Sequence, residues 1–321
     1  MGLTLVYFSI SVFLAINMGA SGFSIAFTPS YGSGIIKRNK AVALFFGFVV
    51  LGAVLVGPRV VETLSTRLVD QITNPVSGVV ILSSAVITMF AANILKVPQS
   101  TSFIMVSAFI GAGLYYENVN YQKLLEIVIF AIVFSALSFI ATYIIIKRFY
   151  PLTSKNMHLH EKVCSNNKLI KKLILFTDCY SGFAIGTNNV ANVIAPIFII
   201  GTALNVPFLF VLFSLMFGIG ALTMGKGNID TLSKNIIPLG EISASIISLV
   251  TSNFVIIASM LGLPAPYVQF TTFSVLAICM VKDGFRQTSG KKIVLRIFSV
   301  WLIVPVVAVV ISWSLHHLLI R

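Results

Sequence analysis

Long apolar segments recur along the whole chain and are separated by short polar connections. Each is about 20 residues long, which is the length that an α-helix needs to cross the hydrocarbon core of a bilayer. A membrane β-barrel would show shorter segments of alternating hydrophobicity, so the pattern predicts an all-α, polytopic membrane protein. We expect about ten transmembrane segments, at residues 2–27, 40–57, 77–95, 98–115, 123–146, 169–200, 206–224, 239–261, 265–282 and 292–317.

A polar stretch divides the chain into two halves with five expected crossings each. An odd number of crossings per half places the second half upside down in the membrane relative to the first, which is the geometry of an inverted repeat. We therefore expect a first repeat over residues 1–148, a cytoplasmic linker over 149–168 and a second repeat over 169–321.

Matching motifs in the two halves support this 5+5 arrangement. The stretch Ala15–Gly22 resembles Gly186–Val193, and Ser100–Ser102 resembles Thr271–Phe273. Both pairs of motifs are offset by 171 residues, which chance similarity would not readily give. The offset predicts that each motif occupies an equivalent place in its own repeat.

The segment Thr187–Val193 brings three carboxamides, Asn188, Asn189 and Asn192, to membrane depth. An Asn surrounded by hydrocarbon must find hydrogen-bond partners, so the segment predicts a broken helix that lines a polar cavity. The alternative is simple hydrogen bonding between neighbouring helices. Because the motif has a counterpart at Asn17, we expect a break in each half.

The two hydroxyl clusters predict a site for an anion. Pro98 suits the first turn of a helix, and Ser100 and Thr101 follow it at once. A helix that begins inside the membrane directs free N–H groups and the positive end of its dipole inward, although such hydroxyls also serve as ordinary caps. We expect the substrate-binding residues to be Asn17, Ser21, Ser100, Thr101, Asn188, Asn189, Asn192, Thr271 and Thr272.

Charge fixes the expected orientation in the membrane. Only 10% of the residues are charged, against about 25% in globular domains. Of the 22 Lys and Arg residues, 18 fall on one side of the ten predicted crossings and 4 on the other. Positively charged loops face the cytoplasm, so we expect a multi-pass protein of the cell membrane with both termini outside. The net charge of +13 then reflects topology and contact with anionic membrane lipid, and nucleic acid is not expected as a partner.

The chain resembles the inorganic phosphate transporter (PiT) family. Both halves of that family carry a Gly-Ala-Asn-Asp-Val-Ala-Asn-Ala motif and a later Pro-Val-Ser-Thr-Thr motif. In this chain Met18 and Asn189 stand at the two Asp positions. The sulfate permease branch of the family is more similar, since its members carry an Asn-x-Gly-Ala-Ser-Gly motif, a Tyr-Gly-Ser-Gly stretch like Tyr31–Gly34, and paired Asn residues like Asn188-Asn189. The resemblance implies a secondary transporter for an inorganic oxyanion.

The missing carboxylates favour sulfate over phosphate. Sulfate at neutral pH is a dianion that offers only acceptors, whereas phosphate keeps an O–H group that needs an acceptor in the site. With Met18 and Asn189 at the Asp positions, the site lacks that acceptor and also lacks two repelling charges. We expect sulfate import, with phosphate as the alternative substrate and an anion channel as a different class of function.

Proton coupling is the expected driving force, because loss of both motif Asp residues weakens the case for sodium, the alternative. Among the acidic residues near membrane segments, Asp178, Glu126 and Glu241, we expect Asp178 to carry the proton. Its alternative role is a salt bridge with Lys171 or Lys172. The sequence contains no nucleophile elbow or zinc signature, so we expect no enzyme, no cofactor and no metal site. A homo-oligomer is compatible with the sequence.

Overall fold

All regular structure in the described part of the chain is helical. The computed structural model describes residues 2–70, 72, 74–94, 99–149, 167–200, 205–235, 240–289 and 292–320. Within these residues one isolated bridge joins Val69 to Val119, and no β-strand forms. Helices satisfy every backbone hydrogen bond internally, which a segment in lipid requires. The predicted all-α class is therefore confirmed, while most of the expected linker lies outside the described residues.

Three short π-helical turns, labelled η, occur among the α-helices. In the first half the elements are α1 (Gly2–Phe27), η1 (Thr28–Gly32), α2 (Arg38–Glu62), η2 (Thr63–Arg67), α3 (Pro75–Ile94), α4 (Thr101–Tyr115) and α5 (Tyr121–Phe149). In the second half they are α7 (Asn167–Ile185), η3 (Gly186–Val190), α8 (Ala191–Ile194), α9 (Ile197–Ile200), α10 (Val206–Asn235), α11 (Glu241–Met260), α12 (Tyr267–Asp283), α13 (Phe285–Ser289) and α14 (Lys292–Leu319).

Eight helical segments in the described residues are long and apolar enough to cross a membrane. Helices also occupy the other two expected positions, but α4 has 15 residues and α12 has 17. At 1.5 Å per residue they measure about 22 Å and 25 Å, less than the roughly 30 Å of a hydrocarbon core. A count of ten full-length crossings is therefore not supported, because these two helices are shorter than the hydrocarbon core is thick.

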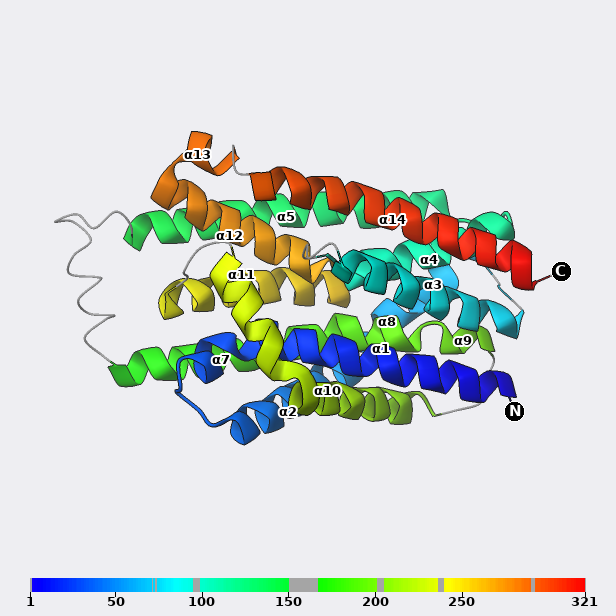
Figure 1. Ribbon diagram of the computed structural model, residues 1–321, viewed down its shortest axis with the longest axis horizontal. Coiled ribbons are helices and arrows are strands. Elements are labelled where there is room, and N and C mark those ends of the chain that lie inside the picture. The colour runs from blue at the N-terminus through cyan, green and yellow to red at the C-terminus, as the bar shows by residue number, and fades with distance from the viewer. Residues whose placement is uncertain are drawn as a thin grey trace.

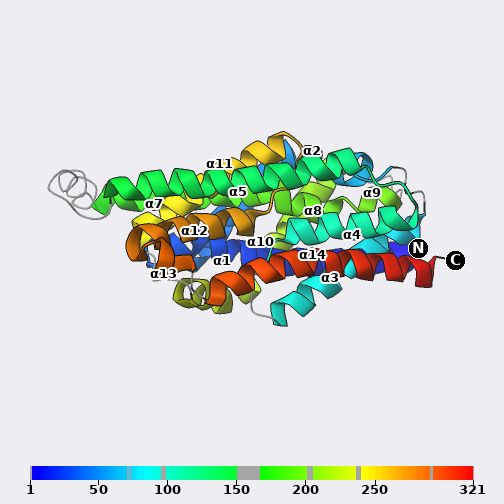
Figure 2. The same cartoon turned by 90° about the horizontal axis from the view of Figure 1, so that it is seen from above.

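The two short helices belong to hairpins that enter the molecule from opposite ends. Helices α3 and α4 form one hairpin and α11 and α12 form the other (Figure 1). The view from above shows the same arrangement, with the first turns of α4 and α12 near the middle of the long axis (Figure 2). The free N–H groups of both helices are thereby brought toward the centre of the bundle.

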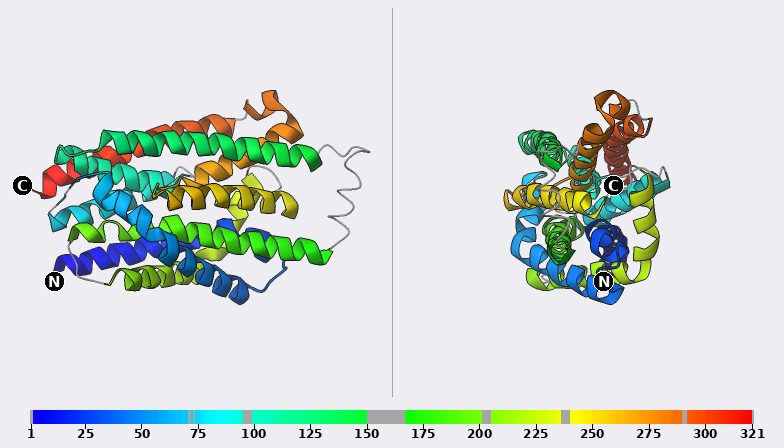
Figure 3. Two further views of the ribbon diagram at one scale, coloured as in Figure 1. Left: turned by 180° about the vertical axis from the view of Figure 1, so that it is seen from behind. Right: turned by 90° about the vertical axis from the view of Figure 1, so that its left-hand side faces the viewer.

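Helix α7 and its continuation form the centre of the bundle. In the span Lys168–Ile199, 83% of the most apolar window is buried inside the protein, against 22–56% for the other seven spans. Seen end-on, α7 and α1 lie side by side near the middle (Figure 3). The Asn-rich motif is therefore located in the segment most shielded from lipid.

Several helices of one half have their main packing partner in the other half. Helix α1 packs along α10, and α7 packs along α2; in the same way α4 packs along α14, and α12 along α5. The two chain ends lie at one end of the bundle, while α5 ends and α7 begins at the other (Figure 1). An inverted repeat would produce this pattern, and the repeat itself stays a prediction.

The expected helix break occurs in the second half only. Residues Gly186–Val190 form the π-helical turn η3, and the helical path ends and restarts around Ala195 and Pro196. In the first half α1 continues without interruption through Gly22 to Phe27, so the expectation of a break there is wrong. The single Asn17 needs no break, because its amide donates to the carbonyl of Phe13 on the same helix.

Candidate anion-binding site

Asn188 ties η3 to the segment that precedes α12. Its Nδ2 donates to the Ala265 carbonyl at 2.8 Å, and its Oδ1 accepts from the Ala265 N–H at 2.8 Å. The side-chain amide thus pairs with both polar groups of one residue's backbone. Asn188 is fully buried, so this pairing satisfies groups that water does not reach.

Ser102 connects the same break to α4. The Ser102 Oγ accepts from Asn188 Nδ2 at 2.8 Å and from Asn192 Nδ2 at 3.0 Å. All three side chains are buried. The two carboxamides therefore reach across to the first turn of α4, and elements from both halves meet at one hydrogen-bonded network without a carboxylate among its members.

The first turn of α4 is built to present N–H groups. Ser100 is the N-cap, and its Oγ accepts from the Phe103 N–H at 3.3 Å. The N–H groups of Thr101 and Ser102 belong to the first turn and have no acceptor within the helix. Together with the helix dipole they make this end of α4 suited to negative charge.

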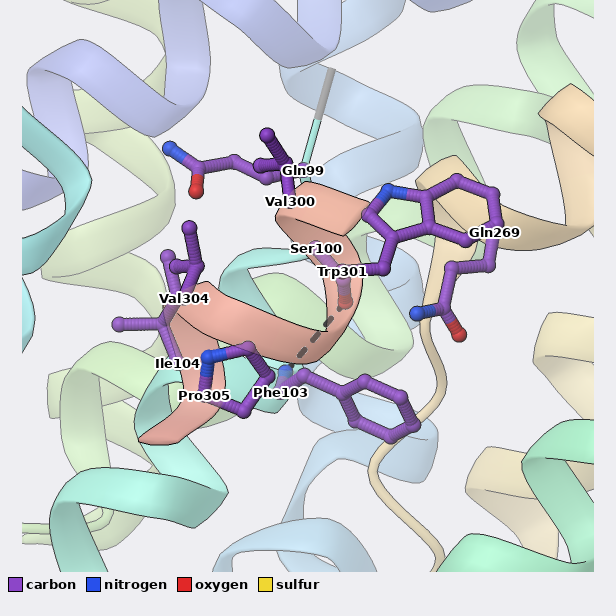
Figure 4. Close-up of a pocket in the computed structure, with 9 residues that line it drawn as sticks. All are labelled: Gln99, Ser100, Phe103, Ile104, Gln269, Val300, Trp301, Val304 and Pro305. Carbon is purple, nitrogen blue, oxygen red and sulfur yellow. Dashed lines mark hydrogen bonds between the residues drawn. The ribbon is translucent and has the colours of Figure 1, made fainter. Parts of the chain in front are cut away.

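A small cavity lies against this first turn, bounded by the starts of α4 and α12 and by the middle of α14. Ser100, Gln269, Trp301 and Pro305 are among the side chains around it (Figure 4). It measures about 10 Å³, which is room for about one water molecule. A tetrahedral oxyanion is larger, so these elements must move apart to admit one.

The other expected site residues bond within their own segments. Asn189 Oδ1 accepts from Asn188, while Ser21 Oγ donates to the Met18 carbonyl. The hydroxyls of Thr271 and Thr272 donate to carbonyls one turn earlier in α12. No hydrogen bond links Asn17, Ser21, Thr271 or Thr272 to the network of Asn188, Asn192 and Ser102. Convergence of all nine residues stays a prediction.

Ser102 and the Ala265 backbone are the members that sequence reasoning missed. Ser102 is the third hydroxyl of the Ser100–Ser102 run, and its counterpart in the second half is Phe273. Comparison of the two halves therefore did not indicate Ser102. The uninterrupted run of three hydroxyl residues was the signal that could have indicated it. No sequence pattern indicated Ala265, because it contributes only backbone atoms.

Asp178 lies in α7. It precedes the Asn188 network along the chain, on the side toward the start of that helix. It is fully buried, and its Oδ2 accepts from the Ser30 N–H of η1 at 2.9 Å. Lys171 and Lys172 are exposed, and no ion pair joins Asp178 to any described residue. The alternative of a salt bridge at the membrane surface is therefore wrong.

A helical membrane bundle with a broken central helix, and with two short helices that begin in its interior, has the architecture of a secondary transporter. Residues 18–312 match the phosphate transporter family, and the chain belongs to that family. It is thus a multi-pass membrane protein of a transporter family and not of an enzyme family.

Individual relatives agree with this assignment. The chain is 31% identical to the sulfate permease CysP of Bacillus subtilis over 313 residues, which cover 97% of this chain and 86% of the relative. It is 23% identical to the protein of Helicobacter pylori strain J99 named "Putative phosphate permease", over 91% of this chain and 71% of that one. A solved structure of a sodium-dependent phosphate transporter superposes with a TM-score of 0.82 at 18% identity, covering 99% of both chains, and so shares the fold.

Proposed function

We propose that the protein is a secondary transporter that imports inorganic sulfate across the cytoplasmic membrane together with protons. The observation that carries this proposal is the composition of the buried network. Asn188, Asn192, Ser102 and first-turn N–H groups meet there, and Met18 and Asn189 stand where the family motif has Asp. Similarity to a sulfate permease over nearly the whole chain supports the same substrate.

The hydrogen bonds of Ser102 give a physical reason for an acceptor-only ligand. Its Oγ receives two N–H donors, while Asn192 Oδ1 is buried without a donor. Turning the Asn192 amide by 180° lets the Ser102 hydroxyl donate to Oδ1 and leaves the Asn192 N–H pair free. A free N–H pair suits sulfate. A phosphate O–H left unpaired in such a site costs about 1–3 kcal/mol.

Asp178 is the proposed proton carrier. Its Oδ1 is buried without a partner, and no cation neutralises it among the described residues. Of the other two candidates, Glu126 pairs with Lys123 at 2.8 Å in a partly exposed site, and the side chain of Glu241 lies outside the described part. A buried carboxylate without a countercharge is stable only when it binds a proton, which fits reversible protonation during transport.

Uptake by purified protein in proteoliposomes tests the proposal. Radiolabelled sulfate and phosphate are supplied side by side, under an inward proton gradient or an inward sodium gradient. We expect sulfate to accumulate under the proton gradient and phosphate to accumulate much less. Preferential phosphate uptake would support the alternative substrate, and sulfate uptake driven by sodium and indifferent to pH would contradict proton coupling.

A further inference from the structure

Helix α8 is too short to be held by its own hydrogen bonds. It contains four residues, Ala191–Ile194, and directly follows the π-helical turn η3. On its other side Pro196 has no N–H group, so the ladder of helical hydrogen bonds is interrupted there. Asn192 is one of the four residues. The backbone that carries the Asn192 side chain is therefore positioned by contacts with other helices.

A tyrosine of α1 supplies one of these contacts. The Tyr7 O–H donates to the Val193 carbonyl at 3.0 Å, across 186 residues of the chain. Val193 directly follows Asn192 in α8, and α1 and α8 lie in contact (Figure 1). Tyr7, Asn192 and Val193 are all fully buried. Because water does not reach this carbonyl, the Tyr7 hydroxyl is the donor that satisfies it.

The ring of Tyr7 is itself held in place by aromatic packing. Phe8, the next residue of α1, stacks on Phe213 of α10 with ring centroids 6.2 Å apart and planes inclined by 7°. The Tyr7 ring stands edge-on to Phe8, with centroids 5.6 Å apart. Such packing leaves the ring little freedom to move. Its hydroxyl therefore ties α8 to a fixed part of the bundle, where α1 packs along α10.

The hydrogen bonds of Tyr7 and of Ser102 act on different parts of the same turn. The Tyr7 bond holds backbone, at the Val193 carbonyl, whereas the Ser102 Oγ accepts from the Asn192 side chain at 3.0 Å. A turn of the Asn192 amide by 180° changes the side-chain bond and leaves the backbone bond in place. The amide can thus rotate to meet an anion while its backbone stays fixed.

We propose that Tyr7 is a positioning residue of the anion site, which acts through the Val193 carbonyl to keep the Asn192 amide directed at the anion. This proposal rests on the proposed anion site and adds a residue that does not itself bind the anion. Without the phenolic O–H a buried carbonyl loses its donor, and the short turn moves to find another. A small movement is enough to weaken binding, because a hydrogen bond depends steeply on distance and direction.

Equilibrium binding of radiolabelled sulfate to the purified full-length protein tests this role. Tyr7→Phe removes the O–H and keeps the ring. We expect the sulfate affinity to fall by about three- to tenfold, as for the loss of one hydrogen bond. We expect the maximum rate of sulfate counterflow in proteoliposomes to change by less than about twofold. An unchanged affinity, with or without a slower maximum rate, would overturn the role.

A double-mutant cycle with Asn192→Ala separates positioning from a general effect on the fold. If Tyr7 acts through Asn192, removal of the amide leaves nothing to position. Tyr7→Phe should then change the affinity of the Asn192→Ala protein by less than about twofold. Equal losses in both backgrounds would show independent effects and overturn the proposal. An unchanged affinity in Asn192→Ala alone would also overturn it, because Tyr7 would have no binding group to position.

Tyr115→Phe is the matched control. The Tyr115 hydroxyl also donates to a distant backbone carbonyl, that of Ile320 at 2.5 Å, 205 residues away. Tyr115 is the last residue of α4, at the opposite end of that helix from Ser102. We expect this variant to unfold at a lower temperature and to keep its sulfate affinity. An equal loss of affinity in Tyr115→Phe and Tyr7→Phe would overturn the assigned role.

Two non-natural side chains at position 7 test the hydrogen-bond donor itself. 4-Aminophenylalanine keeps an N–H donor at the same place on the ring, and we expect it to restore the affinity to within about twofold of the unmodified protein. Failure to restore it would overturn the proposal. 4-Fluorophenylalanine fills the space of the hydroxyl without donating. It takes the place of Tyr7→Phe in every comparison if that variant does not fold.

Measurements with both anions separate this proposal from the proposed substrate. If the unmodified protein binds phosphate in preference to sulfate, the substrate assignment fails, and the same cycle measured with phosphate decides the role of Tyr7. If the unmodified protein binds neither anion, the candidate site itself is wrong and the role of Tyr7 falls with it.

Discussion

Two asparagines four residues apart have different hydrogen-bonding states in the network. The two N–H groups of Asn188 Nδ2 are shared among three acceptors, on Ser102, Asn189 and Ala265, and its Oδ1 accepts from Ala265. Asn192 makes one bond, to Ser102, and its Oδ1 has no donor. A saturated amide holds structure, whereas the Asn192 amide can turn by 180°, accept from Ser102 and offer its N–H pair to a ligand. We therefore assign Asn188 a positioning role and Asn192 a binding role in the proposed site.

Ser102→Ala tests the network at the level of one atom. It leaves the N–H groups of Asn188 and Asn192 without their shared acceptor, and a buried unsatisfied group costs about 1–3 kcal/mol. We expect a lower unfolding temperature and sulfate affinity reduced by about five- to a hundred-fold. Ser135→Ala is the control, because Ser135 is also buried but donates only to the Ala131 carbonyl of its own helix. Similar affinities in the two variants would argue against a role for Ser102 in binding.

Close helix contacts in both halves depend on glycine. A Cβ on Gly52 of α2 would lie 2.1 Å from the Phe183 carbonyl oxygen of α7, and one on Gly186 would lie 2.2 Å from the Val49 carbonyl oxygen. At the contact between α1 and α10, a Cβ on Gly220 would lie 2.0 Å from the Ile16 carbonyl oxygen. Small residues let membrane helices approach at their backbones, and here they hold η3 against α2.

Gly52→Ala should separate α2 from α7. Overpacking of this kind costs about 1–3 kcal/mol, so we expect a lower unfolding temperature in detergent and weaker sulfate uptake. Gly47→Ala on the same helix is the matched control, since no atom lies within 4 Å of its added Cβ. We expect that variant to be as stable as the unmodified protein. Equal stability of the Gly52 and Gly47 variants would show that the α2–α7 contact tolerates displacement.

At the scale of the whole molecule, neither half packs independently of the other. Each half contributes helices whose main neighbours belong to the opposite half, as in the pairs α1–α10 and α2–α7. The network of Asn188 and Ser102 crosses between the halves in the same way. Movement of one half relative to the other would therefore rearrange the candidate site directly, which is the kind of coupling that alternating access requires.

Counterflow distinguishes a carrier of this kind from an anion channel. The cavity beside α4 measures about 10 Å³, so an oxyanion could bind there only if the surrounding helices moved. A carrier must reorient its binding site to the outside after each uptake step. It reorients faster with a bound anion than without one. We expect sulfate inside the vesicles to accelerate uptake of labelled sulfate from outside, and gluconate inside to have no such effect. Uptake that is independent of internal sulfate would favour the channel.

The sequence by itself determined the helical membrane class and the position of the polar break. Both are local properties, because the length of an apolar run decides whether it spans lipid, and carboxamides within such a run require partners. Asn188, Asn192 and Ser100 were therefore predicted from neighbouring residues alone. Met18 and Asn189 likewise identified the departure from the phosphate transporter motif.

Only the tertiary structure decided which groups satisfy these side chains. Asn188 bonds to Ala265, which is 77 residues away, and to Ser102, which is 86 residues away. Asp178 accepts from Ser30 across 148 residues, where the sequence suggested a nearby lysine as the alternative partner. The sequence shows that a buried polar group needs a partner, but the packing of the helices selects it.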